Sequence, residues 1–264
     1  MKKSALVYHY SVLLLLFFIL ALPIAGTFLY SISSSWNTTV LPDGLTLKWY
    51  GQLWADLRFV WSFVRSLIIC FAAVVIAIVL IFPVVFVVNY YFPKLKLLMQ
   101  FAIVLPFAVP PIVSSVGLLQ LYADDPLTLT GTPWILIGCY FTIALPFIYR
   151  AIENNIQAIN LHDLIDTAVL LGSSVTKAVF LIILPNLKKG ILSAIFLSFS
   201  FLIGEFIFAN MLVGSQFETL QVYLYNSRNM SGHYSSAIVM SYFALILIAT
   251  WIANYINKDN LKGK

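Results

Sequence analysis

The chain has 264 residues, of which 61% are hydrophobic and only 9% are charged, and its mean hydropathy is +0.96. Soluble proteins carry about 25% charged residues, so this composition excludes an ordinary soluble domain and predicts one helical membrane domain over residues 1–264. The formal net charge of +5 comes from basic residues spread over many segments, which argues against nucleic acid as a partner. Cys70 and Cys139 lie inside apolar runs and the three histidines are scattered, so no metal site is expected.

Six apolar runs are candidates for membrane-spanning helices. A helix needs about 20 mainly apolar residues to cross the hydrocarbon core of a bilayer. The expected spans are residues 11–32, 66–88, 97–121, 134–149, 191–213 and 237–256. The predicted fold is therefore an all-α polytopic membrane protein with six transmembrane helices.

The first run begins like a secretory signal, with Lys2 and Lys3 before the apolar residues. Its apolar part is longer than the roughly 7 to 15 residues of a signal peptide, and no clear cleavage site follows. We therefore expect an uncleaved first span. Residues 33–60 are rich in polar and aromatic side chains, which suit a membrane interface.

The third run contains Pro106, Pro110 and Pro111, followed by Gly117. Prolines inside a helix kink or interrupt it. A broken helix at membrane depth is tolerated where it is buried in protein or lines a cavity. We expect the three prolines and Ser114 to lie on the translocation path, the alternative being a kink that only improves packing.

The fourth run is short, and we expect it to continue as a helix from Arg150 to Ile159. The loop from 150 to 190 then contains two further helices. Asn160 can cap the first of these, with Asp163 three residues later as the capping-box acid. Apolar residues recur at helical spacing up to Ala168, and Gly172 suits a left-handed residue after the last turn.

The second helix of this loop is expected to begin after Ser173 or Ser174 and to run from Val175 toward Ile183, limited by Pro185. The whole segment thus predicts a helix, a glycine turn and a helix outside the lipid. Such a segment suits a surface that another protein grips. The alternative is an amphipathic hairpin on the membrane surface.

Glu205 is the one ionisable residue well inside an expected span. A carboxylate at this depth is costly unless it is paired or faces water, and it is a functional candidate by default. Ser198 lies two turns earlier on nearly the same face. We expect both on the translocation path, which Glu205 lines or helps to gate, the alternative being a structural acid bonded to Ser or Asn side chains on adjacent helices.

The distribution of basic residues predicts the orientation. If both termini are cytoplasmic, eleven basic residues fall on the inner side and four on the outer side, as the positive-inside rule requires. The inner residues are then Lys2, Lys3, Lys94, Lys96, Arg150, Lys177, Lys188, Lys189, Lys258, Lys262 and Lys264. The outer residues are Lys48, Arg58, Arg65 and Arg228.

The loop resembles the cytoplasmic coupling loop of type I ABC importer permeases, which has the form E-A-A-x-x-x-G followed by I-x-L-P. Asp166 and Thr167 replace the Glu and the first Ala of that pattern, whereas the second Ala and the Gly are kept. The resemblance implies that an ATPase contacts residues of this loop, namely Asp163, Asp166, Thr167, Ala168, Gly172, Ser173, Ile182, Leu184 and Pro185.

Further stretches extend the resemblance over nearly the whole chain. The third run is similar to an L-P-x-x-x-P pattern of the family. WNTTVLPDGLTLKWY after the first span and DPLTLTGTPWIL before the fourth are similar to permeases of polyamine and 2-aminoethylphosphonate importers. The resemblance thus implies a small charged solute of that class, with ferric iron, thiamine or another small solute as alternatives.

The resemblance also implies the partners. A second, probably non-identical permease chain would complete the path, two ATPase subunits would bind ATP and Mg, and an extracytoplasmic protein would deliver the solute to this inner-membrane chain. The chain has no G-x-x-x-x-G-K-[ST] phosphate loop, so we expect no cofactor in it and no enzyme activity of its own. Two alternatives are a secondary transporter working without ATP and a membrane-embedded enzyme, but neither internal repeats nor convergent polar groups are visible.

Overall fold

The computed structural model describes all residues except 1, 38 and 259–264, so Lys262 and Lys264 of the charge count lie outside the described residues. The described residues are helical, apart from turns and one isolated β-bridge between Ser33 and Leu45. This confirms the all-α prediction. The chain forms two compact units, Met1–Val60 with Tyr223–Leu247 and Trp61–Val222 with Ile248–Lys264.

The smaller unit, with residues from both ends of the chain, consists of long apolar helices joined by an aromatic loop. It contains α1 (Lys2–Ser31), α2 (Lys48–Ala55), the first turn of α3 (Leu57–Tyr90), the end of α10 (Leu220–Asn226) and most of α11 (Gly232–Lys258). The ring of His233 stacks on Tyr30 and on Trp49, with centroids 4.0 and 5.5 Å apart. Its Nδ1 lies 2.8 Å from the Tyr30 carbonyl oxygen, so α11 begins against the end of α1.

A buried polar group fixes α10 in this unit. The Tyr223 hydroxyl donates to Asp56 Oδ2 at 2.6 Å and lies 2.8 Å from the Tyr234 hydroxyl. Burial, together with the bond to Asp56, raises the pKa of Tyr223. The segment between the fifth and sixth expected spans therefore contains a short helix, α10, held by this polar group.

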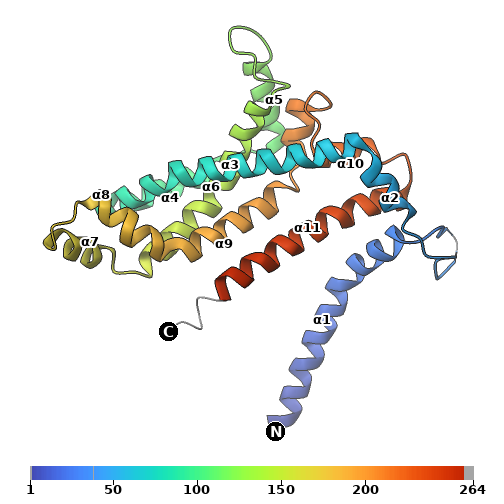
Figure 1. The fold of residues 1–264 in the computed structure, drawn as a ribbon, viewed down its shortest axis with the longest axis horizontal. Helices are drawn as coiled ribbons and strands as arrows, with labels where there is room; N and C mark the ends of the chain where they lie inside the picture. The colour runs from blue at the N-terminus through green and yellow to red at the C-terminus, as the bar shows by residue number, and fades with distance from the viewer. Residues whose placement is uncertain (1, 38, 259–264) are drawn as a thin grey trace. The chain divides into compact units, whose positions relative to one another are not determined.

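The larger unit is built around helices that pack along one another. After α3 come η1 (Pro93–Leu95), α4 (Lys96–Ala108), α5 (Pro111–Tyr122) and α6 (Pro133–Gln157). The chain continues through α7 (Leu161–Leu170), α8 (Val175–Ala178), the π-helix η2 (Val179–Ile183), α9 (Leu184–Leu202) and the π-helix η3 (Ala209–Val213). Helix α6 packs against both α4 and α9, and Figure 1 shows α7 and α8 at one end of this unit.

A glycine allows the close approach of α6 and α9. A Cβ atom at Gly190 of α9 would lie only 1.9 Å from the side-chain nitrogen of Asn155 on α6. Asn155 in turn donates to the Ala151 carbonyl oxygen at 2.7 Å, a bond within its own helix that fixes the position of the amide. A side chain at 190 would therefore displace the Asn155 side chain and break this bond.

The helices account for the six predicted spans. Five described helices are long and apolar enough to cross a membrane, and α4 and α5 form a sixth crossing if their bent pair, broken at residues 109–110, is one span. The second span was predicted too short, because α3 starts at Leu57 and not near residue 66. The helix includes two arginines that stack on aromatic rings, Arg58 on Tyr223 and Arg65 on Phe217. These contacts let charged residues extend an apolar helix.

Pro185 does not end the second helix of the 150–190 loop, so that prediction was wrong. The helix is continuous from Val175 to Leu202. Within it, η2 shifts the hydrogen bonding so that the Leu184 N–H bonds to the Val179 carbonyl oxygen, five residues back. Pro185, which lacks the N–H of other residues, follows this π-turn within the continuous helix.

The fifth span also differs from the prediction of one helix over 191–213. Helix α9 ends at Leu202, and non-helical residues that include Gly204 and Glu205 follow before the chain becomes helical again and enters η3. The hydropathy of residues 191–213 does not reveal this break, because only a few non-helical residues interrupt the span and the residues on both sides of them are apolar.

Candidate translocation cavity and coupling segment

A mainly apolar cavity of about 210 Å³ lies where the third span breaks. Helices α4 and α5 meet there at an angle of 85°. The wall residues come from α4, α5, α6 and the helical turn that leads into η3, namely Pro106, Phe107, Val109, Pro111, Ser114, Leu118, Cys139, Thr142, Ile143 and Phe208. Pro110 and Pro111 thus lie at the interruption of the helix beside the cavity, whereas Pro106 lies inside α4.

The structure brings together only part of the predicted path. Pro106, Pro111 and Ser114 line the cavity, whereas Pro110 precedes α5 as its N-terminal cap residue and is not in the wall. Ser198 is fully buried on α9, outside the cavity wall, and its hydroxyl has no hydrogen-bond partner among the described residues. Cys139 and Thr142 are wall residues that the sequence did not single out.

Glu205 is not among the wall residues, but its side chain bonds to the backbone of one of them, Phe208. Its carboxylate oxygens accept from the backbone N–H groups of Phe208, at 2.8 Å, and Ala209, at 3.2 Å. The side chain therefore caps the helical turn that follows the break, and this turn contributes Phe208 to the cavity. Backbone amides, and not Ser or Asn side chains of other helices, satisfy this acid. The geometry favours a structural role for Glu205 over direct solute contact.

The coupling segment, residues 160–185, has the predicted turn at Gly172. Its φ of +83° lies in the left-handed region, which glycine adopts without strain. The N–H of Gly172 bonds to the Val169 carbonyl and that of Ser173 to the Ala168 carbonyl, both at 2.9 Å, which is the Schellman arrangement. At the next helix, the Ser174 side chain accepts from the Lys177 N–H, so Ser174 and not Ser173 is the cap.

Helix α7 is held by its buried face and by a contact at the end of α3. Leu161, Ile165 and Ala168 are buried, which confirms the apolar stripe expected from their spacing. The Tyr90 hydroxyl at the end of α3 donates to Asp166 Oδ1 at 3.1 Å. The Tyr90 ring also stacks on His162, with centroids 4.9 Å apart. Asn160 is the N-cap residue, but its side chain makes no capping bond to the backbone and donates instead to Asp163 Oδ2, so the predicted side-chain cap is wrong.

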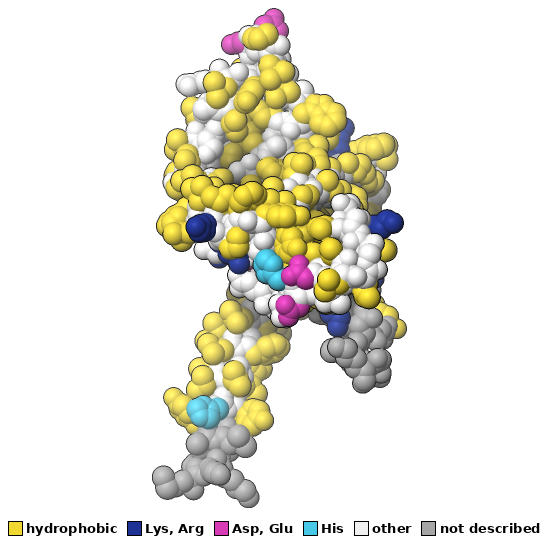
Figure 2. All heavy atoms as spheres, turned by 90° about the vertical axis from the view of Figure 1, so that its left-hand side faces the viewer, with side chains coloured by type: hydrophobic (Ala, Val, Ile, Leu, Met, Phe, Trp, Pro, Cys, Tyr) yellow, Lys and Arg dark blue, Asp and Glu magenta, His cyan; other side chains and the backbone are white. Residues whose placement is uncertain are grey.

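The other face of the coupling segment is exposed and partly apolar. Leu170 and Leu171, beside the Gly172 turn, are 87% and 83% exposed, and Phe180 and Leu181 are exposed on the next helix. The other predicted residues of the loop divide by exposure: Asp163, Asp166, Thr167 and Pro185 are exposed, whereas Ser173, Ile182 and Leu184 are half-buried. Figure 2, which views this end of the unit, shows histidine and acidic side chains together with hydrophobic ones around them.

Two buried acids were missed in the sequence. Glu153 on α6 is 1% exposed, although the sequence reads as a solvated helix there. It accepts from Gln100 Nε2 of α4 at 3.0 Å. Glu218 is also buried, and Ser62 Oγ donates to its Oε2 at 3.4 Å. Both partners are far away in the sequence, so no local pattern could have revealed these sites. The described residues contain no group of three or more side chains able to hold a metal.

A family profile matches the sequence of this chain. The profile described as binding-protein-dependent transport system inner membrane component covers residues 84–262, more than half of the chain. The chain belongs to this family. The prediction of a type I ABC importer permease is thereby confirmed, and the protein is a multi-pass inner-membrane permease subunit.

Two relatives cover almost the whole permease. The chain is 27% identical over 256 residues to PhnV of Salmonella choleraesuis (strain SC-B67), a permease protein named for 2-aminoethylphosphonate transport, covering 92% of this chain and 93% of the relative. It is also 27% identical over 263 residues to the permease protein cysT of Marchantia polymorpha, named for sulfate transport, covering 94% and 85%. These relatives agree on the type of protein and differ in the solute.

The fold is shared with a solved transporter structure. A chain of a bacterial ABC transporter involved in the import of the acidic polysaccharide alginate superposes with a TM-score of 0.74 at 17% identity. The match covers 97% of the permease and 98% of that chain. At this identity the likeness establishes a common fold.

Proposed function

We propose that this permease is one of two chains that form the translocation path of an ATP-driven importer for a small charged solute of the 2-aminoethylphosphonate or polyamine class. The cavity at the break between α4 and α5 carries this proposal, because a broken helix within a membrane is found where it lines a path or is enclosed by protein. The coupling segment would receive the ATPase, and a solute-binding protein would deliver the solute from the other side.

The cavity wall indicates where solute selectivity arises. Ser114 and Thr142 supply hydroxyl groups, and the wall contains no charged side chain. A charged solute would therefore pass with weak contacts, and the solute-binding protein would choose it. This division also explains why relatives with similar permease sequences carry names for different solutes.

The coupling segment is suited to mechanical contact with an ATPase. Its buried face and the Tyr90–Asp166 bond join α7 to the rest of the unit, while Leu170 and Leu171 stay exposed. Exposed leucines beside a rigid turn form the kind of apolar patch that marks a protein interaction site. In the proposed transporter these residues face the cytoplasm, and both chain termini lie on the same side.

Uptake by the complete transporter tests the solute. Cells lacking the permease gene would be complemented with the chain, its partner chain, the ATPase and the solute-binding protein, and supplied with labelled 2-aminoethylphosphonate, putrescine or sulfate. We expect uptake of 2-aminoethylphosphonate that depends on both the permease and the binding protein. Uptake of putrescine instead would assign the polyamine part of the proposed class, uptake of sulfate alone would place the solute outside that class, and uptake without an ATPase would contradict the importer itself.

A variant of the permease separates solute delivery by the solute-binding protein from uptake through the permease. Gly172→Val should reduce uptake because it disturbs the coupling segment, while the solute-binding protein retains its affinity. The Asp124→Asn change in the exposed turn after α5 serves as control and should leave uptake unchanged. An ATPase that still co-purifies with the Gly172→Val chain in normal yield would argue against the coupling segment as its docking site.

A further inference from the structure

Glu153 forms a polar link between two walls of the cavity. Its Oε1 accepts from Gln100 Nε2 at 3.0 Å, which joins α6 to α4. Its Oε2 lies 3.7 Å from Arg150 Nη1, and the Arg150 side chain is 51% exposed. The carboxylate is thus buried, with the Gln100 amide as its donor, the Tyr149 hydroxyl nearby and one distant, partly solvated cation.

The bond between Glu153 and Gln100 lies at a different level of the helices from the cavity. Cys139, in the cavity wall, and Glu153 are 14 residues apart on α6, about 21 Å along the axis. Leu161, the first residue of α7, follows eight residues after Glu153. On α4, Gln100 lies six residues before Pro106, another wall residue, about 9 Å along that axis. The link therefore lies between the coupling segment and the cavity.

Stability alone gives little reason for an acid here. Burying a carboxylate costs free energy, and apolar residues of similar volume often replace a buried ion pair without loss of stability. A polar bond of fixed geometry does something that an apolar contact does not: it holds α4 in one register against α6. Between two packed helices, such a bond transmits a displacement of one helix to the other.

We propose that Glu153 is a positioning residue that couples α4 to α6, so that a movement of the coupling segment reaches both walls of the cavity. This inference rests on the proposed function. Without the link, α6 would move with α7 while α4 and the broken span stay behind. ATP hydrolysis would then continue without the full change in the cavity.

The chain carries a natural reporter for this movement. Cys139 lies in the cavity wall, and the other thiol, Cys70, is fully buried. The complete complex with a Cys70→Ser permease would be reconstituted in nanodiscs and treated with methyl methanethiosulfonate, either without nucleotide or after trapping with ATP, Mg and vanadate. Mass spectrometry of the Cys139 peptide gives the labelling rate in each state, and no solute is needed.

The variants distinguish coupling from folding. In Glu153→Leu, we expect the ratio of the two labelling rates to fall by about fivefold or more, the size typical of a lost coupling. Assembly and ATP hydrolysis should persist. Glu153→Gln retains an acceptor for Gln100 and should keep most of the ratio. Glu153→Gln combined with Gln100→Glu exchanges donor and acceptor and should keep it as well, while Asp124→Asn is the surface control.

The outcomes are separable. A Glu153→Leu complex that shows the wild-type ratio would overturn the inference and leave the importer intact. Should that variant fail to assemble, Gln100→Leu breaks the same bond from a half-buried position, and a wild-type ratio there overturns the inference equally. A wild-type complex that hydrolyses no ATP would overturn the proposed function, and the inference with it.

Discussion

Glu205 stabilises the backbone next to the cavity without being one of the cavity wall residues. Its two oxygens satisfy two backbone N–H groups that the break in the fifth span leaves without helical partners. Unpaired amides in a membrane interior cost several kcal/mol, which gives the acid a structural reason for its position. The same bonds occupy both oxygens, so a passing solute would have to compete with them.

Substitutions at Glu205 separate capping from solute contact. Glu205→Gln retains only one acceptor oxygen and should lose part of the cap, whereas Glu205→Leu strands both N–H groups at about 1–3 kcal/mol each. We expect transport and the melting temperature of the detergent-solubilised complex to decrease together, in the order wild type, Gln, Leu. Transport that falls in Glu205→Gln at an unchanged melting temperature would instead support direct contact with a cationic solute.

Gly190 offers a second test at the scale of single residues. Gly190→Ala places a methyl group into Asn155, and overpacking of this kind costs about 1–3 kcal/mol. We expect a lower melting temperature and a lower yield of assembled complex. Asn155→Ala in the same chain removes the obstruction and should restore most of the loss. If Gly190→Ala alone melts like the wild type, α6 and α9 are not as closely packed as the structure shows.

At the scale of elements, Gly172 separates α7 from α8 by its conformation alone. No atom lies within 4 Å of a Cβ built on this glycine, so a side chain meets no obstacle within the chain. The backbone φ of +83° is what a β-branched residue resists, while asparagine tolerates the left-handed region best among non-glycine residues. Two substitutions of similar size therefore distinguish backbone conformation from a clash with a partner.

Gly172→Val should weaken co-purification of the ATPase and reduce uptake, with normal insertion of the permease into the membrane. If only the backbone conformation at this residue matters, Gly172→Asn should retain most of the ATPase co-purification and most of the uptake. If a partner approaches closely at this point, Asn and Val should be equally damaging. Pull-down of the ATPase with each tagged permease, at equal membrane levels, measures the difference.

The elements also show what the sequence could predict. Local patterns sufficed for α7, whose buried stripe follows helical spacing, for the Gly172 turn and for the break at Pro110 and Pro111. They failed where the backbone changed its hydrogen bonding, as in the π-turn that precedes Pro185. They failed again for Glu153, because Gln100, the residue that gives this acid its site, is 53 positions away in the chain.

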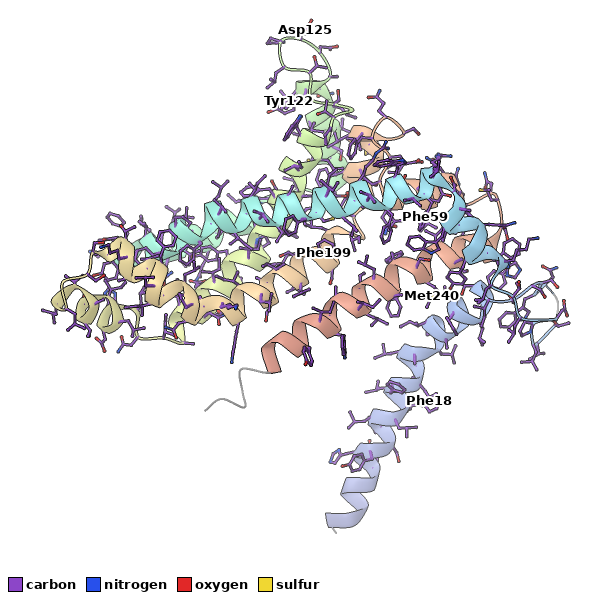
Figure 3. All side chains as sticks on the ribbon, viewed as in Figure 1. Phe18, Phe59, Tyr122, Asp125, Phe199 and Met240 are labelled. Atoms are coloured by element: carbon purple, nitrogen blue, oxygen red, sulfur yellow. The ribbon has the colours of Figure 1, made fainter. Side chains whose placement is uncertain are left out.

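At the scale of the whole molecule, the number of crossings decides where the ends of the chain lie. The α4–α5 pair can be one broken span, giving six crossings, or a re-entrant loop, giving five. Six crossings place both termini on one side of the membrane, and five place them on opposite sides. Figure 3 labels Asp125 in the loop that follows α5, and this loop is the point at which the two topologies differ.

Cysteine labelling in intact cells tests the six-span topology. Lys94, Asp124, Lys188 and Arg228 are exposed, so single cysteines at these positions, in a chain without Cys70 and Cys139, are accessible to reagent on their own side of the membrane. A membrane-impermeant maleimide should label positions 124 and 228 in intact cells, and positions 94 and 188 only after permeabilisation. A re-entrant pair would place 94 and 124 on the same side, so equal labelling of these two would contradict six crossings. Labelling of 94 but not of 124 in intact cells would reverse the orientation predicted from the basic residues and place the coupling segment away from any cytoplasmic ATPase.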